Sequence, residues 1–188
     1  MFMLILGLVA FLGIHLVPVF APLRSVLAMR LGETTYTGMF SAVSGIGLVL
    51  IVAGYAYAPR GAQLFEPVAA AKLLAPATMI VSFILLAAAN MKSHIRRALK
   101  HPMLLGVGIW SAVHLLANGH IKASILFGAF LAFAAIDLVS ATLRGASKSF
   151  QPVVKHDVIA VAGGGMVALL FMALHRMLIG VPAVAWGL

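Results

Sequence analysis

Cysteine and charged residues are the two scarcities of this chain. It has 188 residues and no cysteine, which excludes iron–sulfur clusters, thiolate zinc sites, haem attachment through cysteine, and disulfides. Only 9% of the residues are charged and 63% are hydrophobic. A soluble domain needs about 25% charged residues to cover its surface, so lipid must be the solvent of this chain. Several apolar runs reach the roughly 20 residues that span a bilayer as helix, which predicts an all-α polytopic membrane bundle.

Acidic residues are the scarcest charged class, with 4 Asp and Glu against 13 Lys and Arg, for a net charge of +9. A basic balance of this kind raises the question of nucleic-acid binding. The cations lie in short loops between apolar runs, however, as the positive-inside rule describes. No basic patch with interleaved aromatic residues is present. We therefore expect membrane lipid, and no nucleic acid, as the surrounding partner.

About six transmembrane helices are predicted, in a single domain covering 1–188. The expected spans are 2–20, 38–56, 73–91, 102–118, 121–142 and 158–176. Only Gly119 and His120 separate the fourth and fifth spans, which predicts a tight antiparallel hairpin. A short amphipathic helix is expected over 22–32, lying in the membrane interface and stopped by Gly32. The apolar tail 178–188 is too short to cross, and Pro182 and Trp186 suit an interfacial cap.

Orientation follows from the loop cations. The odd-numbered loops hold nine Lys and Arg, and the other face holds four. Both termini should therefore face away from the cytoplasm. The start of the chain lacks the positive segment of a signal peptide and is expected to form the first span.

Two histidines, His15 and His114, fall inside apolar spans. An ionisable residue in lipid is costly and is a functional-site hypothesis by default. Helix geometry puts both near the middle of the bilayer, at depths that differ by about 8 Å. Neutral imidazole binds iron, copper or zinc, so a shared metal, above all a haem iron held between the two rings, is the favoured hypothesis. The alternative is that each ring only forms a hydrogen bond with a neighbouring helix.

Further candidates surround His114 in the sequence. Trp110 lies one turn before it and Asn118 one turn after it, on the same helix face. Asn118 either orients the imidazole or caps the helix end. His101 begins the fourth span, close to Arg97 in a basic cluster. His101 and Arg97 could contact haem propionates. Alternatively, His101 could cap the helix.

Three other groups of residues have structural expectations. Asp137 is the only acid within a span, and we expect an ion pair with Arg24, Arg30 or Arg144 in preference to a proton relay. His175 is expected to be solvated at the interface, with a second metal-ligand role as the alternative. Small residues should allow close helix approach, namely the pair Ser41 and Gly45 and the triple Gly163 to Gly165. The loop histidines His94, His120 and His156 are expected to have no special role.

A family resemblance is carried by two blocks of motifs. The first block contains Phe11-Leu-Gly-Ile-His15, Pro22-Leu-Arg24, Arg30-Leu-Gly32, Tyr36 and Phe40-Ser-Ala-Val-Ser44. The second contains His101-Pro-Met-Leu-Leu-Gly106, Trp110, His114-Leu-Leu-Ala-Asn-Gly119, Leu126-Phe-Gly128 and Asp137. Together they resemble the NnrU family over nearly the whole chain. The resemblance implies a bacterial inner-membrane protein associated with denitrification and nitric oxide metabolism.

The same pattern is similar to plant 15-cis-zeta-carotene isomerase. That resemblance implies a haem b protein with His15 and His114 as axial ligands, and it is patchier outside the motifs. Three function classes follow: a redox or nitric-oxide-linked haem protein, a haem-dependent cis-trans isomerase acting on a carotenoid or other polyene, and a cofactor-free assembly factor. Whether the protein is an enzyme stays open at this point.

Overall fold

The computed structural model describes residues 1–147 and 149–184, and their ordered elements are helices. Eight are present: α1 (Phe2–Val19), α2 (Ala21–Leu31), α3 (Glu33–Tyr57), α4 (Ala69–Ala88), α5 (His94–Leu99), α6 (Pro102–Asn118), α7 (Ile121–Leu143) and α8 (Val154–Ile179). Five of them, α1, α3, α4, α7 and α8, are long and apolar enough to cross a membrane, and α6 is a shorter apolar helix. The prediction of an all-α, multi-pass membrane protein with about six spans is confirmed.

Most predicted boundaries agree with the helices within a few residues, and α6 agrees at both ends. The largest difference is at α3, which begins at Glu33 and not near Gly38. Gly32 has a φ of 81°, which ends α2 and lets α3 start at once, with an acidic residue in the first turn where the helix dipole favours it. The predicted helix over 22–32 is present as α2. Trp186, part of the predicted interfacial cap, lies outside the described residues.

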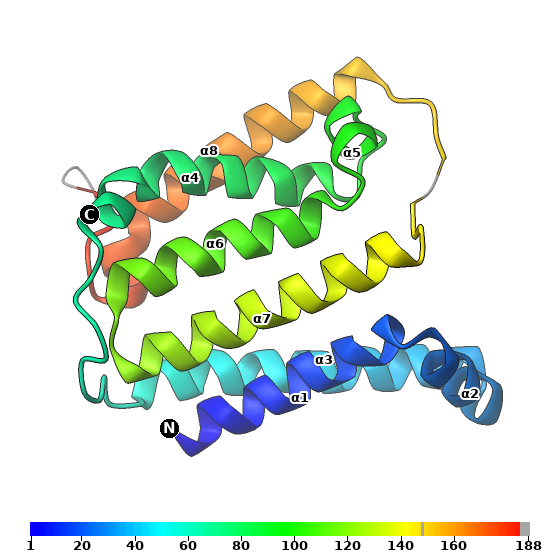
Figure 1. Ribbon diagram of the computed structural model, residues 1–188, viewed down its shortest axis with the longest axis horizontal. Coiled ribbons are helices and arrows are strands. Elements are labelled where there is room, and N and C mark those ends of the chain that lie inside the picture. Colours follow the sequence, from blue (N-terminus) through cyan, green and yellow to red (C-terminus); the bar gives the residue numbers. More distant parts are fainter. Residues whose placement is uncertain (148, 185–188) are drawn as a thin grey trace.

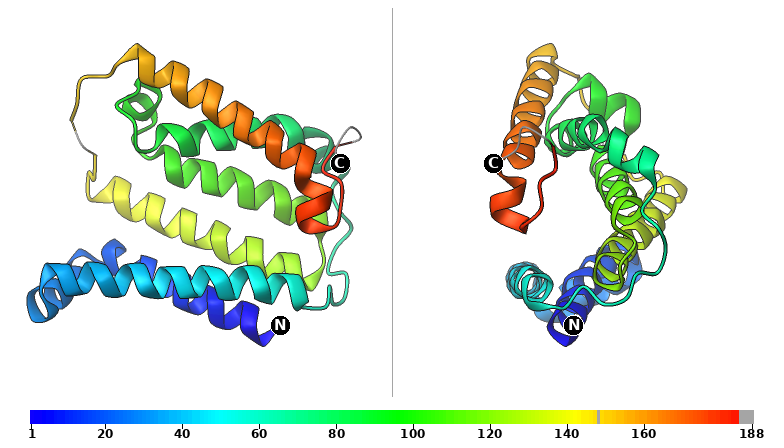
Figure 2. Two further views of the ribbon diagram at one scale, coloured as in Figure 1. Left: turned by 180° about the vertical axis from the view of Figure 1, so that it is seen from behind. Right: turned by 90° about the vertical axis from the view of Figure 1, so that its left-hand side faces the viewer.

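The six long helices form one curved row (Figure 2, right). Neighbouring helices pack in the order α3, α1, α7, α6, α4, α8. α3 and α8 therefore lie at the two ends of the row, and α7 lies at its middle. Both views of Figure 2 show α7 between α6 and the α1–α3 pair. The hairpin predicted for 102–118 and 121–142 is the pair α6–α7.

Glycine contacts set the close approach of α1 and α3. A Cβ added at Gly7 would lie 2.6 Å from the backbone nitrogen of Ile51, and one at Gly47 would lie 2.8 Å from that of Phe11. No real side chain fits at such distances. Because lipid removes the hydrophobic drive that joins helices in water, van der Waals contact between backbones is what holds this pair.

The same device joins α4 to its two neighbours. A Cβ on Gly106 of α6 would lie 2.9 Å from the carbonyl oxygen of Ser82, and one on Gly164 of α8 would lie 2.7 Å from that of Phe83. The fully buried Ser82 hydroxyl donates a hydrogen bond to the carbonyl of Gly106 at 2.8 Å. Two tightly packed blocks result, α1–α3 and α4–α6–α8.

Only part of the small-residue prediction is correct. Gly164 packs against α4, but a Cβ on Gly163 or Gly165 would meet nothing within 4 Å. Ser41 and Gly45 are exposed, so the pair predicted for them is wrong. Small-residue spacing does not by itself say which face of a helix meets a neighbour.

One end of the bundle collects most of the positive charge, and we call it the basic end. It comprises α2, α5, residues 144–147 and 149–153 and the start of α8, which lie together at the right of Figure 1. Eight described cations lie there: Arg24, Arg30, Lys92, Arg96, Arg97, Lys100, Arg144 and Lys155. The opposite end holds the start of α1, the α6–α7 turn and the end of α8 (Figure 1).

Backbone hydrogen bonds fasten the α3–α4 segment to the α6–α7 turn. The N–H of Leu64 donates to the carbonyl of Gly119 at 2.8 Å, and the N–H of Ile121 donates to the carbonyl of Ala62 at 3.0 Å. The Lys122 ammonium donates to carbonyls at the end of α3, those of Tyr55 at 3.1 Å and Ala58 at 3.0 Å. Orphan carbonyls of a helix end thereby receive donors.

Replacing Gly119 tests this fastening. Gly119 has a φ of 70°, and a Cβ there would collide with the carbonyl oxygen of Phe65. We expect Gly119→Ala to lower the free energy of unfolding by about 1–3 kcal/mol, from the left-handed backbone and the clash. Thermal unfolding in detergent, followed by circular dichroism, measures the change. Gly128→Ala is the matched control, because a Cβ there meets nothing within 4 Å; equal loss in both variants would contradict the prediction.

His120 has a structural role that its place in a loop does not predict. Its Nδ1 accepts a hydrogen bond from the N–H of Ala123 at 3.2 Å and so caps α7. Burial, followed by the nearby positive charges of Arg60 and Lys122, lowers the pKa of His120 from its usual 6.5. The folded state therefore favours the neutral ring, and protonation removes the acceptor.

The free energy of unfolding should consequently decrease as the pH is lowered and His120 becomes protonated. The folded state binds fewer protons than the unfolded state between its lowered pKa and about 6.5, so stability declines as the pH drops below that value. His120→Asn keeps a capping oxygen without a titrating group. We expect the melting temperature of the variant to depend less on pH below about 6.5 than that of the wild type. Parallel pH profiles for the two proteins would show that His120 contributes nothing to this dependence.

Candidate functional site

His15 lies in an aromatic setting on α1. Its ring stacks on Phe11 with centroids 4.3 Å apart and also approaches Phe40 of α3 at 5.0 Å. Phe133 of α7 presents its ring edge-on at 6.2 Å. The Nδ1–H donates to the carbonyl of Phe11 at 2.7 Å. The imidazole is thus half-buried where α1, α3 and α7 meet.

His114 has an equivalent setting on α6. Its ring lies 4.8 Å from that of Phe127 on α7 and 5.5 Å from that of Trp110. The Nδ1–H donates to the carbonyl of Trp110 at 2.8 Å. Both histidines therefore donate to the carbonyl four residues earlier in their own helix.

This shared hydrogen bond has a chemical consequence. A neutral imidazole that donates through Nδ1 carries its lone pair on Nε2, which is the atom that ligates a metal. Metal-ligating histidines almost always donate their other N–H to a carboxylate or backbone carbonyl, as His15 and His114 do here. The donor chemistry of the two residues therefore fits an iron.

The two imidazoles are linked through aromatic rings of α7. Phe130 lies 5.9 Å from Phe11 and 5.4 Å from Trp110, between centroids. We call Phe11, Trp110, Phe127, Phe130 and Phe133 the aromatic seam. His114 contacts the seam at Phe127 and His15 contacts it at Phe133. These positions differ by about 9 Å along α7, which agrees with the difference in depth expected from the sequence.

A third histidine, His175, lies near the end of α8. Its Nδ1–H donates to the carbonyl of Val181 at 2.7 Å. His175 is half-buried close to the end of α8, so its expected interfacial position stays a prediction. Among the described residues, no protein group forms a hydrogen bond with the Nε2 of His175.

The described residues include no cluster of three or more His, Asp or Glu side chains able to hold a metal ion. A bare ion usually needs three or four protein ligands. A metallated macrocycle needs only one or two axial ligands from the protein.

A family model for NnrU proteins matches residues 3–183. The chain belongs to the NnrU family. No curated protein and no solved structure gives a significant match. The resemblance to carotene isomerase therefore stays a prediction, and so do the ligand roles of His15 and His114 in this NnrU protein.

The structure separates the two interpretations of Asn118. Its side-chain amide donates to the backbone carbonyl of His114 at 2.7 Å and not to the imidazole. The carbonyl of Asn118 itself accepts from Gln63 at 2.9 Å. Asn118 therefore stabilises the end of α6, as the helix-capping alternative proposed. Trp110, by contrast, contacts the His114 ring directly.

Arg97 and His101 lie away from the histidine pair in this family member. His101 is the N-cap residue of α6, about 20 Å along the helix from His114. Arg97 is exposed on α5 at the basic end. Their contact with haem propionates stays a prediction.

Two polar pairs settle other expectations. Asp137 lies 3.8 Å from Arg144, one of its three predicted partners, whereas Arg24 pairs with Glu33.

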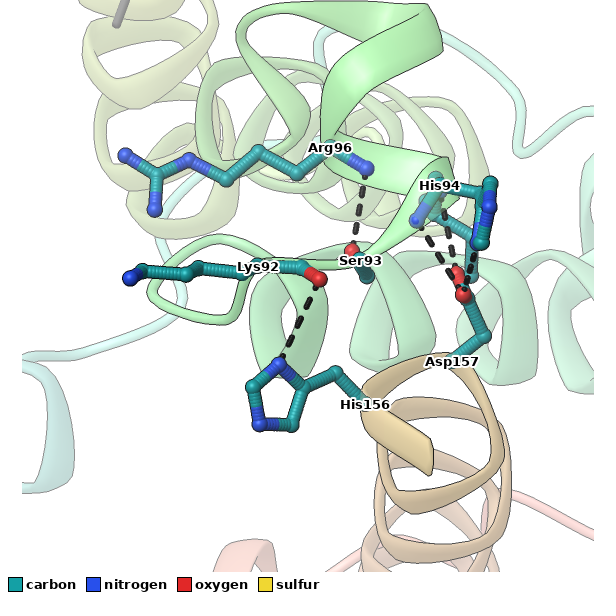
Figure 3. Close-up of polar contacts among 7 residues, drawn as sticks. Lys92, Ser93, His94, Arg96, His156 and Asp157 are labelled. Atoms are coloured by element: carbon teal, nitrogen blue, oxygen red, sulfur yellow. Dashed lines mark hydrogen bonds and ion pairs between the residues drawn. The ribbon is translucent and has the colours of Figure 1, made fainter. Parts of the chain in front are cut away.

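His94 was expected to have no role, but its Nδ1 lies 2.7 Å from the Asp157 carboxylate. The oxygens of that carboxylate also accept hydrogen bonds from the N–H groups of His94 and Ile95 at 3.1 Å (Figure 3). The pairing joins α5 to α8 across more than sixty residues, and no local pattern predicts it.

Proposed function

We propose that this NnrU protein binds haem b, with His15 and His114 supplying imidazole Nε2 ligands, and serves a redox or nitric-oxide-linked role. The observation that carries the proposal is the matched pair of hydrogen bonds to the carbonyls of Phe11 and Trp110. Each bond selects the tautomer that leaves Nε2 available.

The surroundings of the pair support the same ligand. Flat aromatic rings of Phe11, Phe127 and Phe130 line the region between the two helices, and the low-dielectric setting keeps imidazole neutral. When bound, haem would supply a redox-active iron, and release of one histidine would free a coordination position for a small gas such as nitric oxide. The protein's part is to orient two imidazoles, exclude water and hold the ring plane in an apolar seam.

The family resemblance and the charge distribution extend the proposal to location. The resemblance to the NnrU family implies that the protein lies in a bacterial inner membrane and is linked to denitrification. The basic end would face the cytoplasm under the positive-inside rule, and the start of α1 would face the periplasm.

An absorption spectrum of the detergent-purified protein tests the haem site. We expect a Soret band that shifts on reduction with dithionite. His114→Ala and His15→Ala should each remove most of the native spectrum, because one axial ligand is lost, and added imidazole should restore it in part. His156→Ala is the matched control, since that ring lies at the basic end, with its Nδ1 3.3 Å from the Lys92 carbonyl.

The other outcomes discriminate between the remaining possibilities. If His175→Ala alters the spectrum and His15→Ala does not, the second ligand is on α8 and the proposed pair is wrong. A colourless, iron-free preparation would contradict haem binding and favour a cofactor-free assembly factor. Conversion of a 15-cis polyene by the reduced protein, with no response to nitric oxide, would favour the isomerase.

A further inference from the structure

A cavity at the basic end is independent of the histidine pair. It has a volume of about 560 Å³ and lies between α5, the start of α6 and the segment before α8. Its charged lining consists of Arg96, Arg97, Lys100 and His101, and its apolar lining includes Met103 and Phe150. The volume falls within the range of small-molecule sites.

No carboxylate is available to balance these cations. The chain has only four Asp and Glu residues, and all four are within the described part. Three are engaged in pairs at the basic end: Glu33 with Arg24, Asp137 with Arg144, and Asp157 with His94. The fourth, Glu66, lies in the α3–α4 segment at the opposite end. The cavity therefore holds positive charge that the side-chain carboxylates leave unbalanced.

The cations are held in place by a well-anchored helix. The buried Ser93 hydroxyl accepts from the N–H of Arg96 at 3.1 Å, and the Lys92 carbonyl accepts from the N–H of Val153 at 2.8 Å. Figure 3 shows the Arg96 side chain extending away from Asp157. Its guanidinium lies over the ring of Phe150, 5.3 Å from the centroid. The short α5 is thus fixed to α8 on one side and directs its cations to the other.

Lys100 supplies a second sign of a specialised site. Its φ is 61°, and the N–H of His101 donates to the carbonyl of Leu99 at 2.6 Å across it. This is a γ-turn with positive φ, a rare and strained conformation that favours glycine. Lysine at this position costs backbone energy and adds a cation to the cavity. Strain of this kind clusters at ligand sites.

We propose that this cavity binds the phosphate-diester headgroup of an anionic phospholipid. Arginine and lysine are the usual partners of phosphate, and basic pockets at the cytoplasmic ends of membrane helices bind such headgroups. The exposed Met103 and Leu99 beside the cations provide apolar surface for the start of the acyl chains. A free phosphate would use the cations but not this apolar surface. The distance of about 20 Å along α6 from His114 separates this ligand from a haem held there.

The test uses the purified full-length protein in an uncharged detergent. Phosphatidylglycerol and phosphatidylcholine with the same acyl chains are titrated separately, and binding is read by native mass spectrometry and by the shift in melting temperature. We expect phosphatidylglycerol to bind and stabilise the protein, and phosphatidylcholine to do so much less. Arg97→Gln and Lys100→Gln should each weaken phosphatidylglycerol binding by roughly fivefold.

Matched controls separate the cavity from general charge. Lys155→Gln and Arg30→Gln remove one cation each from the basic end without touching the cavity, and should leave the lipid affinity unchanged. Lys100→Gly removes the cation and suits the positive φ, so it should bind lipid less while folding at least as stably as the wild type. The absorption spectrum should be the same in the Lys100, Lys155 and Arg30 variants as in the wild type, which keeps this result separate from the haem test.

Three results would overturn the proposal. Equal loss of affinity in the cavity variants and in the Lys155 and Arg30 controls would mean that only bulk charge attracts lipid. No loss in Arg97→Gln and Lys100→Gln would mean that the cavity is not the site. Equal stabilisation by inorganic phosphate and by phosphatidylglycerol would make the ligand a soluble phosphate and not a lipid.

Discussion

Backbone-to-backbone contact at glycine is the constraint on which this structure depends. In lipid, apolar side chains gain little by leaving their solvent, so helices must touch closely to stay together. Gly7 and Gly47 provide that contact for α1–α3, and Gly106 and Gly164 provide it for α4 with α6 and α8. These contacts create two tight blocks.

The central helix α7 joins the two blocks by a different means. A Cβ at its Gly128 would meet nothing within 4 Å, and its contacts with α1 and α6 include the rings of Phe127, Phe130 and Phe133 and the buried side chains of Ala123 and Leu126. Side chains can rearrange where closely packed backbones cannot. It is at this adjustable seam that His15 and His114 lie, each held in the same tautomer by its own helix.

Charge divides the molecule along its length. Three of the four carboxylates are at the basic end, and each is used to fix a local structure there, as Asp157 does for α5. The arginines and lysines of the cavity are therefore left to interact with something outside the chain. Anionic lipid is the nearest abundant source of negative charge for a protein in this setting, and the strained turn at Lys100 indicates that the arrangement does more than set orientation.

Much of the fold was predictable from local pattern. The α6–α7 hairpin follows from Pro102 at the first turn of one helix and Gly119 after its end, since proline and glycine act on the backbone where they stand. The end of α2 at Gly32 has the same origin. The intramembrane position of His15 and His114 follows from hydropathy alone.

Pairings between distant segments were not predictable in this way. α5, the His94–Asp157 pair and the capping role of His120 went unrecognised, because each depends on contacts or exposures that a single sequence does not display. Ser41 and Gly45 have the spacing of a helix-packing pair but lie on an exposed face. The close backbone contacts at Gly7 and Gly47 were not predicted.

The sequence by itself determined that this is a multi-pass α-helical membrane protein, with two costly histidines at similar depth and one strongly positive end. Composition and periodicity act residue by residue, and lipid leaves a chain of this composition no other solvent. Only the tertiary structure decided which helix faces meet, that α7 lies between the two histidines, and that unbalanced cations enclose a cavity. Those features arise from packing between segments as far apart in sequence as α1 and α7, where Ser140 bonds to Val19, 121 residues away. The physical reason is steric, because which glycine meets which backbone depends on the whole row of helices.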